Sequence, residues 1–222
     1  MKMKKYVLRL VTGAAAAALL LSGCAAGEKS ASEPSSASAG QTDAVTSATV
    51  KDSGTARAQI EAEAAALVHQ NENGQIVLSH KYGETVMPGH PQRIVCIKLE
   101  DLALALGVDL TASQQLEGYY LEDQIQSLGI GSIAVDEESN TVNLEQVLSY
   151  EPDLILLRDS FEPSVYEELS KIAPVAAFDL KDTEVSLLAM GKALGMEQEA
   201  LSRLEQYHQK LDNAKEALSA VS

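Results

Sequence analysis

Short apolar runs alternate with amphipathic stretches along most of the chain after residue 75. The apolar runs have the length of strands and lie at 93–98, 109–113, 132–135, 153–157 and 175–178. The stretches between them have helical spacing and lie at 100–106, 121–128, 144–149, 164–172 and 185–194. Residues 154–157 are continuously apolar, as a parallel strand covered on both faces must be. The alternation therefore predicts an α/β fold, with a parallel sheet between two layers of helices.

The last part of the chain follows a different pattern. Leu201, Leu204, Leu211 and Leu218 recur at helical spacing, with Glu, Gln and Lys residues between them. They predict one long helix that starts at 198 and runs for about 20 residues, near 30 Å at a rise of about 1.5 Å per residue.

The residues between the start of the chain and the alternating region differ in composition from one stretch to the next. Residues 24–58 are rich in Ala, Ser, Thr and Gly and contain no Leu, Ile or aromatic residue, so they predict a flexible tether. Residues 59–74 predict a marginal helix and a turn, because helix formers are abundant but the apolar stripe is weak. Two short strands, 75–79 and 84–87, predict a β-hairpin.

Residues 1–23 have the layout of a secretory signal. Four basic residues and no acid precede an apolar run at 11–21. That run is too short to cross a bilayer core as a helix, which takes about 20 residues. Leu-Ser-Gly-Cys at 21–24 resembles the bacterial lipobox, in which the cysteine receives a diacylglyceryl group and the chain is cut before it. We therefore expect lipidation of Cys24 and attachment to the extracytoplasmic face of the cell membrane. The alternative is an ordinary signal with a chance cysteine.

Charge and motifs exclude several classes of function. The 32 acidic and 17 basic side chains give a formal net charge of −15, which disfavours nucleic-acid binding because phosphates require a basic face. The sequence has no Gly-x-Ser-x-Gly, Gly-x-Gly-x-x-Gly, phosphate-loop or His-Glu-x-x-His motif, so we do not expect an enzyme. The four histidines are scattered without ligand spacing, and we expect neither a metal site nor a cofactor.

Five segments resemble the iron-siderophore and vitamin B12 solute-binding proteins of ABC importers. They are Pro-x-Arg-Ile-Val at 91–95, Ala-Leu-Gly-Val at 105–108, Asn-Leu-Glu at 143–145, Glu-Pro-Asp-Leu-Ile at 151–155 and Leu-Ser-Lys-Ile-Ala-Pro at 169–174. Each segment is weak alone, but their order and spacing behind a lipobox make the resemblance specific. It covers about residues 75–222.

The resemblance implies two α/β lobes joined by one long rigid helix, with the ligand in the cleft between them. On that template, residues 75–196 form the N-terminal lobe of a helical-hinge binding protein, a three-layer Rossmann-like parallel sheet. Residues 197–222 then begin the connecting helix, and the second lobe is absent.

The implied function is that of a membrane-anchored, extracytoplasmic component of an ABC importer. It would capture a ferric siderophore as its ligand and deliver it to the permease. Two alternatives stay open: cobalamin or haem binding by the same fold, or a truncated lobe that only contacts the permease or has no function.

Four residues are candidates for ligand contact, because ligands of open parallel sheets lie beyond the carboxyl ends of the strands. Lys98 and Arg158 can donate charged hydrogen bonds to a large oxygen-rich complex, and Tyr119 and Tyr120 can offer flat aromatic surfaces. Arg158 is the best candidate, since a cation directly after four buried apolar residues calls for an anionic partner. The alternatives are an ion pair of Arg158 with a nearby carboxylate, a solvated strand end for Lys98 and ordinary packing for the tyrosines.

Glu145 is a candidate for contact with the permease. In the resembling family, one exposed glutamate on each lobe docks into arginine pockets of the permease, and Asn-Leu-Glu is the matching pattern. The same residues also suit a structural role, because Asn143 is a good N-cap and Gln146 completes a capping-box-like pair. A glutamate in the first turn is further favoured by the helix dipole, and both roles can hold together.

Overall fold

The computed structural model describes residues 53–115 and 117–219. The predicted signal, Cys24 and most of the predicted tether lie outside these ranges.

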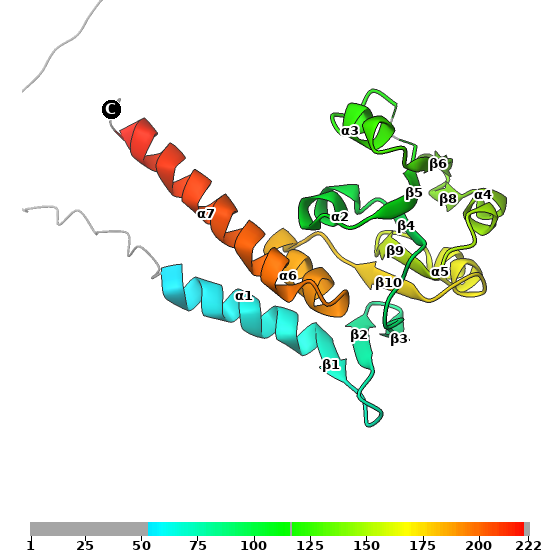
Figure 1. Ribbon diagram of the computed structural model, residues 1–222, viewed down its shortest axis with the longest axis horizontal. Helices are drawn as coiled ribbons and strands as arrows, with labels where there is room; N and C mark the ends of the chain where they lie inside the picture. Colours follow the sequence, from blue (N-terminus) through cyan, green and yellow to red (C-terminus); the bar gives the residue numbers. More distant parts are fainter. Residues whose placement is uncertain (1–52, 116, 220–222) are drawn as a thin grey trace, which may run out of the picture. The chain divides into compact units, whose positions relative to one another are not determined.

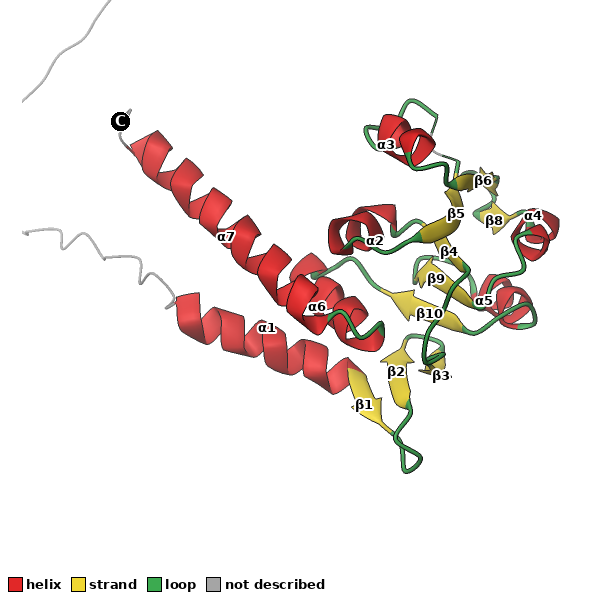
Figure 2. Ribbon diagram, viewed as in Figure 1, coloured by secondary structure: helices red, strands yellow, loops and turns green. Residues whose placement is uncertain are grey.

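Five strands form a parallel sheet in the order β10-β9-β4-β5-β6 (Figure 2). They are β4 (Ile94–Ile97), β5 (Leu110–Gln114), β6 (Gly131–Ile133), β9 (Leu154–Arg158) and β10 (Val175–Phe178). Every neighbouring pair in this sheet is parallel. The predicted α/β fold is therefore confirmed.

Helices cover both faces of the sheet. They are α2 (Glu100–Leu106), α3 (Glu122–Ser127), α4 (Leu144–Ser149), α5 (Pro163–Ser170) and α6 (Thr183–Ala193). Successive residues of a strand point to opposite faces. Ile94 and Cys96 accordingly join the core that contains α2 and α6, whereas Val95 and Ile97 join the core that contains α4 and α5. The three-layer arrangement is confirmed, and it explains why the strand sequences are apolar without interruption.

A smaller antiparallel sheet precedes the parallel one. It follows helix α1 (Ser53–Leu67) and consists of β1 (Val68–Gln70), β2 (Ile76–His80) and β3 (Gly83–Val86), in the order β1-β2-β3. The predicted hairpin is present as β2 and β3, whereas β1 was not predicted. A further antiparallel pair that was not predicted, β7 (Val135–Asp136) and β8 (Thr141–Val142), follows β6.

Helix α1 differs from its sequence-based prediction. It begins at Ser53, within the residues assigned to the tether, and it packs against α6 (Figure 1). Ala64 and Val68, at the end of the helix and the start of β1, are buried in the core shared with α2 and α6. The apolar stripe of the helix is weak because its contacts with this core come from Ala64 and the partly buried Ile60 and Leu67, so its pattern indicated a marginal helix although the helix is part of the fold.

The long C-terminal helix is present as α7 (Glu197–Ser219) and comprises 23 residues. Ala200 and Leu204, in its first two turns, are buried in the same core as α6. Tyr207, Leu211 and Leu218 lie further along and are exposed. Only the start of α7 is thus packed into this core.

Candidate functional site

The carboxyl ends of β4 and β9 meet at a point where the chain reverses its direction across the sheet. From β4 the chain proceeds to β5 and β6 on one side, and it later adds β9 and β10 on the other. Such topological switch points are where open α/β sheets bind ligands. Ile97 pairs with Leu157 in the register of these strands, directly before Lys98 and Arg158. The structure therefore brings the two predicted cations to one edge of the sheet.

Lys98 is held in place by three neighbours. Its Nζ donates to Glu137 Oε2 at 2.9 Å and to Asn140 Oδ1 at 3.0 Å, and it lies 5.2 Å from the ring centroid of Phe161. Its side chain is only 16% exposed, and its φ of 60° is in the left-handed region, which is unusual for a residue other than glycine. Lys98 is therefore an ion-paired residue and not the solvated strand end of the alternative interpretation.

The turn between β7 and β8 supplies the two hydrogen-bond partners of Lys98, Glu137 and Asn140. Glu137 also accepts a hydrogen bond from Gln114 Nε2, so it joins the ends of β4 and β5. The hydrogen bond from Lys98 is the main cause of a lowered pKa at Glu137. Gln114 Oε1 is buried and has no hydrogen-bond partner within the described residues.

Glu100, the first residue of α2, is buried beside Lys98. Its Oε1 accepts hydrogen bonds from the backbone N–H of Lys98 at 3.2 Å and of Gln114 at 3.1 Å. The residue is 5% exposed, and burial raises its pKa to about 7, although these hydrogen bonds oppose the shift. The sequence analysis did not single out Glu100 or Gln114. The available signal was a carboxylate placed three residues after a fully apolar strand.

Arg158 differs from Lys98 in having no partner. Its side chain is half-buried, and it makes no hydrogen bond or ion pair with any residue in 53–115 or 117–219. Its neighbour Asp159 lies on the same loop, yet the two side chains do not pair. The alternative interpretation, an ion pair with a nearby carboxylate, thus finds no support within the described residues.

The loop that follows Arg158 is fixed from two sides. From the β2–β3 hairpin, Tyr82 donates its hydroxyl to the carbonyl of Phe161 at 2.6 Å, and Lys81 Nζ donates to the carbonyl of Asp159 at 2.9 Å. From the β7–β8 turn, Asn140 Nδ2 donates to the carbonyl of Ser160 at 3.1 Å. The backbone at Arg158 is therefore held in place although its guanidinium group is unpaired.

Tyr119 and Tyr120 lie at the surface, beside the start of α2. They are 41% and 72% exposed, and their ring centroids are 4.5 Å apart. Both hydroxyls donate to the carboxylate of Asp101, and the hydrogen bond to Asp101 is the main cause of a raised pKa at Tyr120. The rings are therefore accessible, whereas their hydroxyl groups are already engaged.

Glu145 is exposed in the first turn of α4. Asn143 caps that helix by accepting from the backbone N–H of Gln146 at 3.1 Å. The expected capping box is incomplete, because Gln146 Oε1 accepts from the backbone N–H of Ala134 at 2.7 Å and not from Asn143. The cap thus accounts for Asn143 and Gln146, whereas the side chain of Glu145 makes no hydrogen bond or ion pair within the described residues.

A cavity of about 720 Å³ lies between α1, β2 and the start of α6. Asp159 and Asp179 line it at the carboxyl ends of β9 and β10, and neither Lys98 nor Arg158 does. The two cations thus occupy an open surface beside this cavity. Within residues 53–115 and 117–219, no group of three or more His, Cys, Asp or Glu residues is arranged to hold a metal ion.

Comparisons with known proteins identify relatives of this chain. A family model described as periplasmic binding protein matches residues 95–221. A Bacillus subtilis protein with the provisional name ABC transporter substrate-binding lipoprotein YhfQ is 30% identical over 165 residues, which cover 68% of this chain and 50% of that protein.

Two solved structures are similar to this chain. PiaA of Streptococcus pneumoniae, an iron uptake ABC transporter substrate-binding protein, is 29% identical with a TM-score of 0.54, and the match covers 64% of this chain and 52% of PiaA. SirA of Staphylococcus aureus, solved with staphyloferrin B, is 29% identical with a TM-score of 0.55, covering 65% of this chain and 50% of SirA. The chain spans about half the length of these relatives.

Proposed function

The chain belongs to the periplasmic binding protein family, and from this premise we propose that it captures a ferric siderophore for an ABC importer and delivers it to the permease. The family consists of solute-binding proteins, which confirms the expectation that the chain is not an enzyme. PiaA has been solved with ferrichrome and SirA with staphyloferrin B, and both molecules are bound as ligands and not as cofactors. These ligands favour a ferric complex over the cobalamin and haem alternatives.

The unpaired guanidinium of Arg158 is the observation that carries this proposal. A half-buried cation at a topological switch point, on a loop fixed from two sides, is prepared to donate hydrogen bonds to an anionic or polarised oxygen. We assign Arg158 as the principal ligand contact of this lobe and the exposed rings of Tyr119 and Tyr120 as its aromatic surface. Lys98 retains a supporting role, because its ammonium group already has partners.

The domain organisation that accompanies this function is also a proposal. Residues 75–196 would form one ligand-binding lobe, and 197–222 would begin the helix that leads to a second lobe. Glu145, exposed on α4, would contact the permease. A truncated lobe that only contacts the permease, or that has no function, is the remaining alternative.

The proposed anchor is a lipid on Cys24, which the lipobox-like residues 21–24 support. The described residues include no helix that is both long and apolar enough to cross a membrane. Cys24→Ser should move the protein from the detergent phase to the aqueous phase in a partitioning experiment. Equal partitioning of the two proteins would contradict the anchor.

Binding of a ferric siderophore tests the central proposal. A complete site with nanomolar affinity corresponds to about −12 kcal/mol, and half of its contacts would leave about −6 kcal/mol, a Kd on the order of tens of micromolar. We therefore expect weak binding of radioactive ferrichrome by the 222-residue chain in equilibrium dialysis.

Arg158→Gln should weaken that binding about tenfold, since it removes a charge-assisted hydrogen bond. Arg203→Gln is the matched control, because it makes the same change of charge on an exposed position of α7 and should leave Kd unchanged. An equal loss of affinity in both variants would contradict the role given to Arg158.

A further inference from the structure

The carboxyl edge of the parallel sheet contains more acidic than basic side chains. The residues that follow β4, β5, β7, β9 and β10 include five carboxylates, Asp101, Glu117, Glu137, Asp159 and Asp179. The same segments hold three cations among the described residues, Lys98, Arg158 and Lys181. The potential at this edge is therefore expected to be negative, unlike that of a cleft built to attract a polyanion.

The pairing of Lys98 reduces its attraction for an anion further. Glu137 Oε2 lies 2.9 Å from Lys98 Nζ, Asn140 accepts a second hydrogen bond, and the ring centroid of Phe161 lies 5.2 Å from the ammonium group. An incoming anion would have to compete with Glu137 for the ammonium group. Arg158 is then the one cation at these two strand ends without a partner among the described residues.

The aromatic part of the surface is also unsuited to a polyanion. The hydroxyls of Tyr119 and Tyr120 donate to Asp101, so they are not free to donate to a ligand. The carboxylate of Asp101 lies beside the accessible rings and would repel a negatively charged complex. These tyrosines therefore offer an aromatic surface suited to a neutral organic framework.

Ferric siderophores include both neutral complexes and polyanionic ones. Three hydroxamate groups carry three negative charges and neutralise one ferric ion, whereas three catecholate groups carry six and leave a triply negative complex. We infer that this lobe selects ferric complexes of the hydroxamate type, with no net charge or a positive one, over tris-catecholates. The inference rests on the proposed function and specifies the chemical class of its ligand.

The test compares two complexes on the intact 222-residue chain. Ferrichrome represents a neutral tris-hydroxamate, and ferric enterobactin represents a tris-catecholate of triple negative charge. We expect ferrichrome to bind about tenfold more tightly in equilibrium dialysis at low salt. Added sodium chloride should strengthen the binding of ferric enterobactin, because salt screens repulsion. Tighter binding of ferric enterobactin, or its weakening by salt, would overturn the inference.

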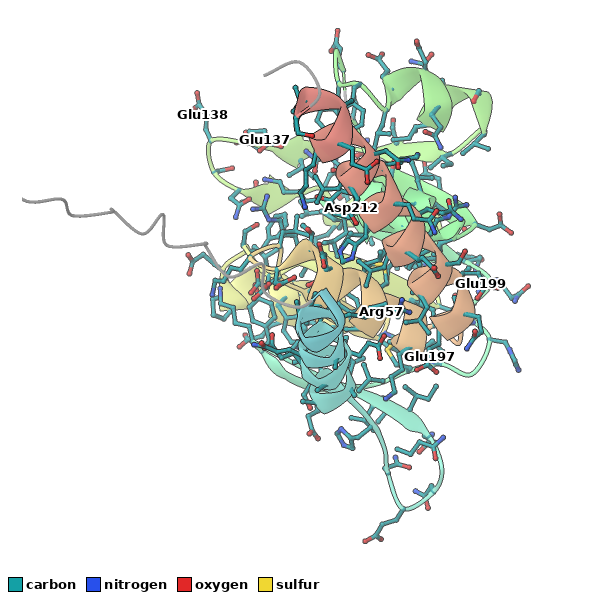
Figure 3. All side chains as sticks on the ribbon, turned by 90° about the vertical axis from the view of Figure 1, so that its left-hand side faces the viewer. Arg57, Glu137, Glu138, Glu197, Glu199 and Asp212 are labelled. Atoms are coloured by element: carbon teal, nitrogen blue, oxygen red, sulfur yellow. The ribbon has the colours of Figure 1, made fainter. Side chains whose placement is uncertain are left out.

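A pair of variants tests the part assigned to Glu137. Glu137→Gln releases Lys98 and should raise the affinity for ferric enterobactin several-fold while leaving that for ferrichrome almost unchanged. Glu138→Gln removes the same charge from the same turn, but Glu138 points away from the body and makes no ion pair within the described residues (Figure 3). It should affect both complexes much less.

The outcomes separate this inference from the proposal on which it rests. Equal effects of the two substitutions would show that Lys98 is not controlled by Glu137 and would overturn the mechanism. Failure of the unaltered chain to bind either complex would contradict the proposed function itself, and the inference with it. Circular dichroism of each variant, expected to match that of the unaltered chain, verifies that the fold is retained.

Discussion

The ends of β4 and β9 lie side by side, yet the cation at one end is ion-paired and the cation at the other has no partner among the described residues. At the end of β4, Lys98 is covered, ion-paired and joined through the buried Glu100 to β5. At the end of β9, the backbone is fixed by the hairpin and the β7–β8 turn, but the guanidinium of Arg158 has no partner in the described part of the chain. A charged group whose hydrogen bonds are satisfied internally contributes to stability, and one that is held without a partner is available to a ligand.

The largest effect is expected at the end of β4, where Glu100 should make the free energy of unfolding depend on pH. The pKa of Glu100 is raised from 4.5 to about 7, so the folded protein binds a proton that the unfolded chain releases. The contribution of Glu100 to the free energy of unfolding is therefore greatest below pH 4.5 and is lost as the pH rises to about 7. Relative to Glu100→Gln, the unaltered protein should lose about 3 kcal/mol across this window.

Urea denaturation of both proteins at several pH values measures this difference. The glutamine variant retains the acceptor oxygen for the two backbone N–H groups but cannot titrate. If the free energy of unfolding changed equally with pH in both proteins between pH 4.5 and 7, the pKa of Glu100 would not be raised by folding. That result would contradict the pH dependence assigned to the end of β4.

A smaller loss of stability is expected at Lys98. Lys98→Met keeps an unbranched side chain and removes the ammonium group that lies 5.2 Å from the ring centroid of Phe161, which should lower the free energy of unfolding by about 1 kcal/mol. The loss is limited because Glu137 is largely exposed and regains water. Lys181→Met, at an exposed position after β10, is the control and should leave the urea midpoint unchanged.

The smallest effect on stability is expected at Arg158. Because Arg158 has no internal partner within residues 53–115 and 117–219, Arg158→Gln should change the free energy of unfolding by less than about 0.5 kcal/mol. The same variant is expected to weaken ferrichrome binding. A loss of stability as large as that of Lys98→Met would instead place Arg158 among the structural residues.

The parallel sheet could be predicted from sequence because its strands are buried on both faces. Residues 154–157 are apolar without interruption for that reason, and they form the buried parallel strand that was predicted there. Strands β1, β7 and β8 were missed because they are two or three residues long and depend on pairing with other segments. Helix α1 was underestimated because only three of its described residues, Ala64, Ile60 and Leu67, pack into the core, which leaves a weak apolar stripe.

The positions of the candidate site residues were predictable, but their partners were not. The rule that ligands lie beyond the carboxyl ends of strands located Lys98 and Arg158 correctly at one edge. The contact between Lys98 and Glu137 spans 39 residues of sequence, and no local pattern distinguishes a lysine with such a partner from one without. The hydrogen bonds from the tyrosine hydroxyls to Asp101 span 18 and 19 residues, and no local pattern predicted them either.

Asn140 connects the two strand ends, and this restricts how the loop around it can evolve. Its side chain accepts from Lys98 Nζ and donates to the carbonyl of Ser160, from a backbone with a φ of 50°. Inserting or deleting one residue between β7 and β8 would displace this amide from both contacts together. Homologues that share this arrangement should therefore keep the length of the turn constant even where its other residues vary.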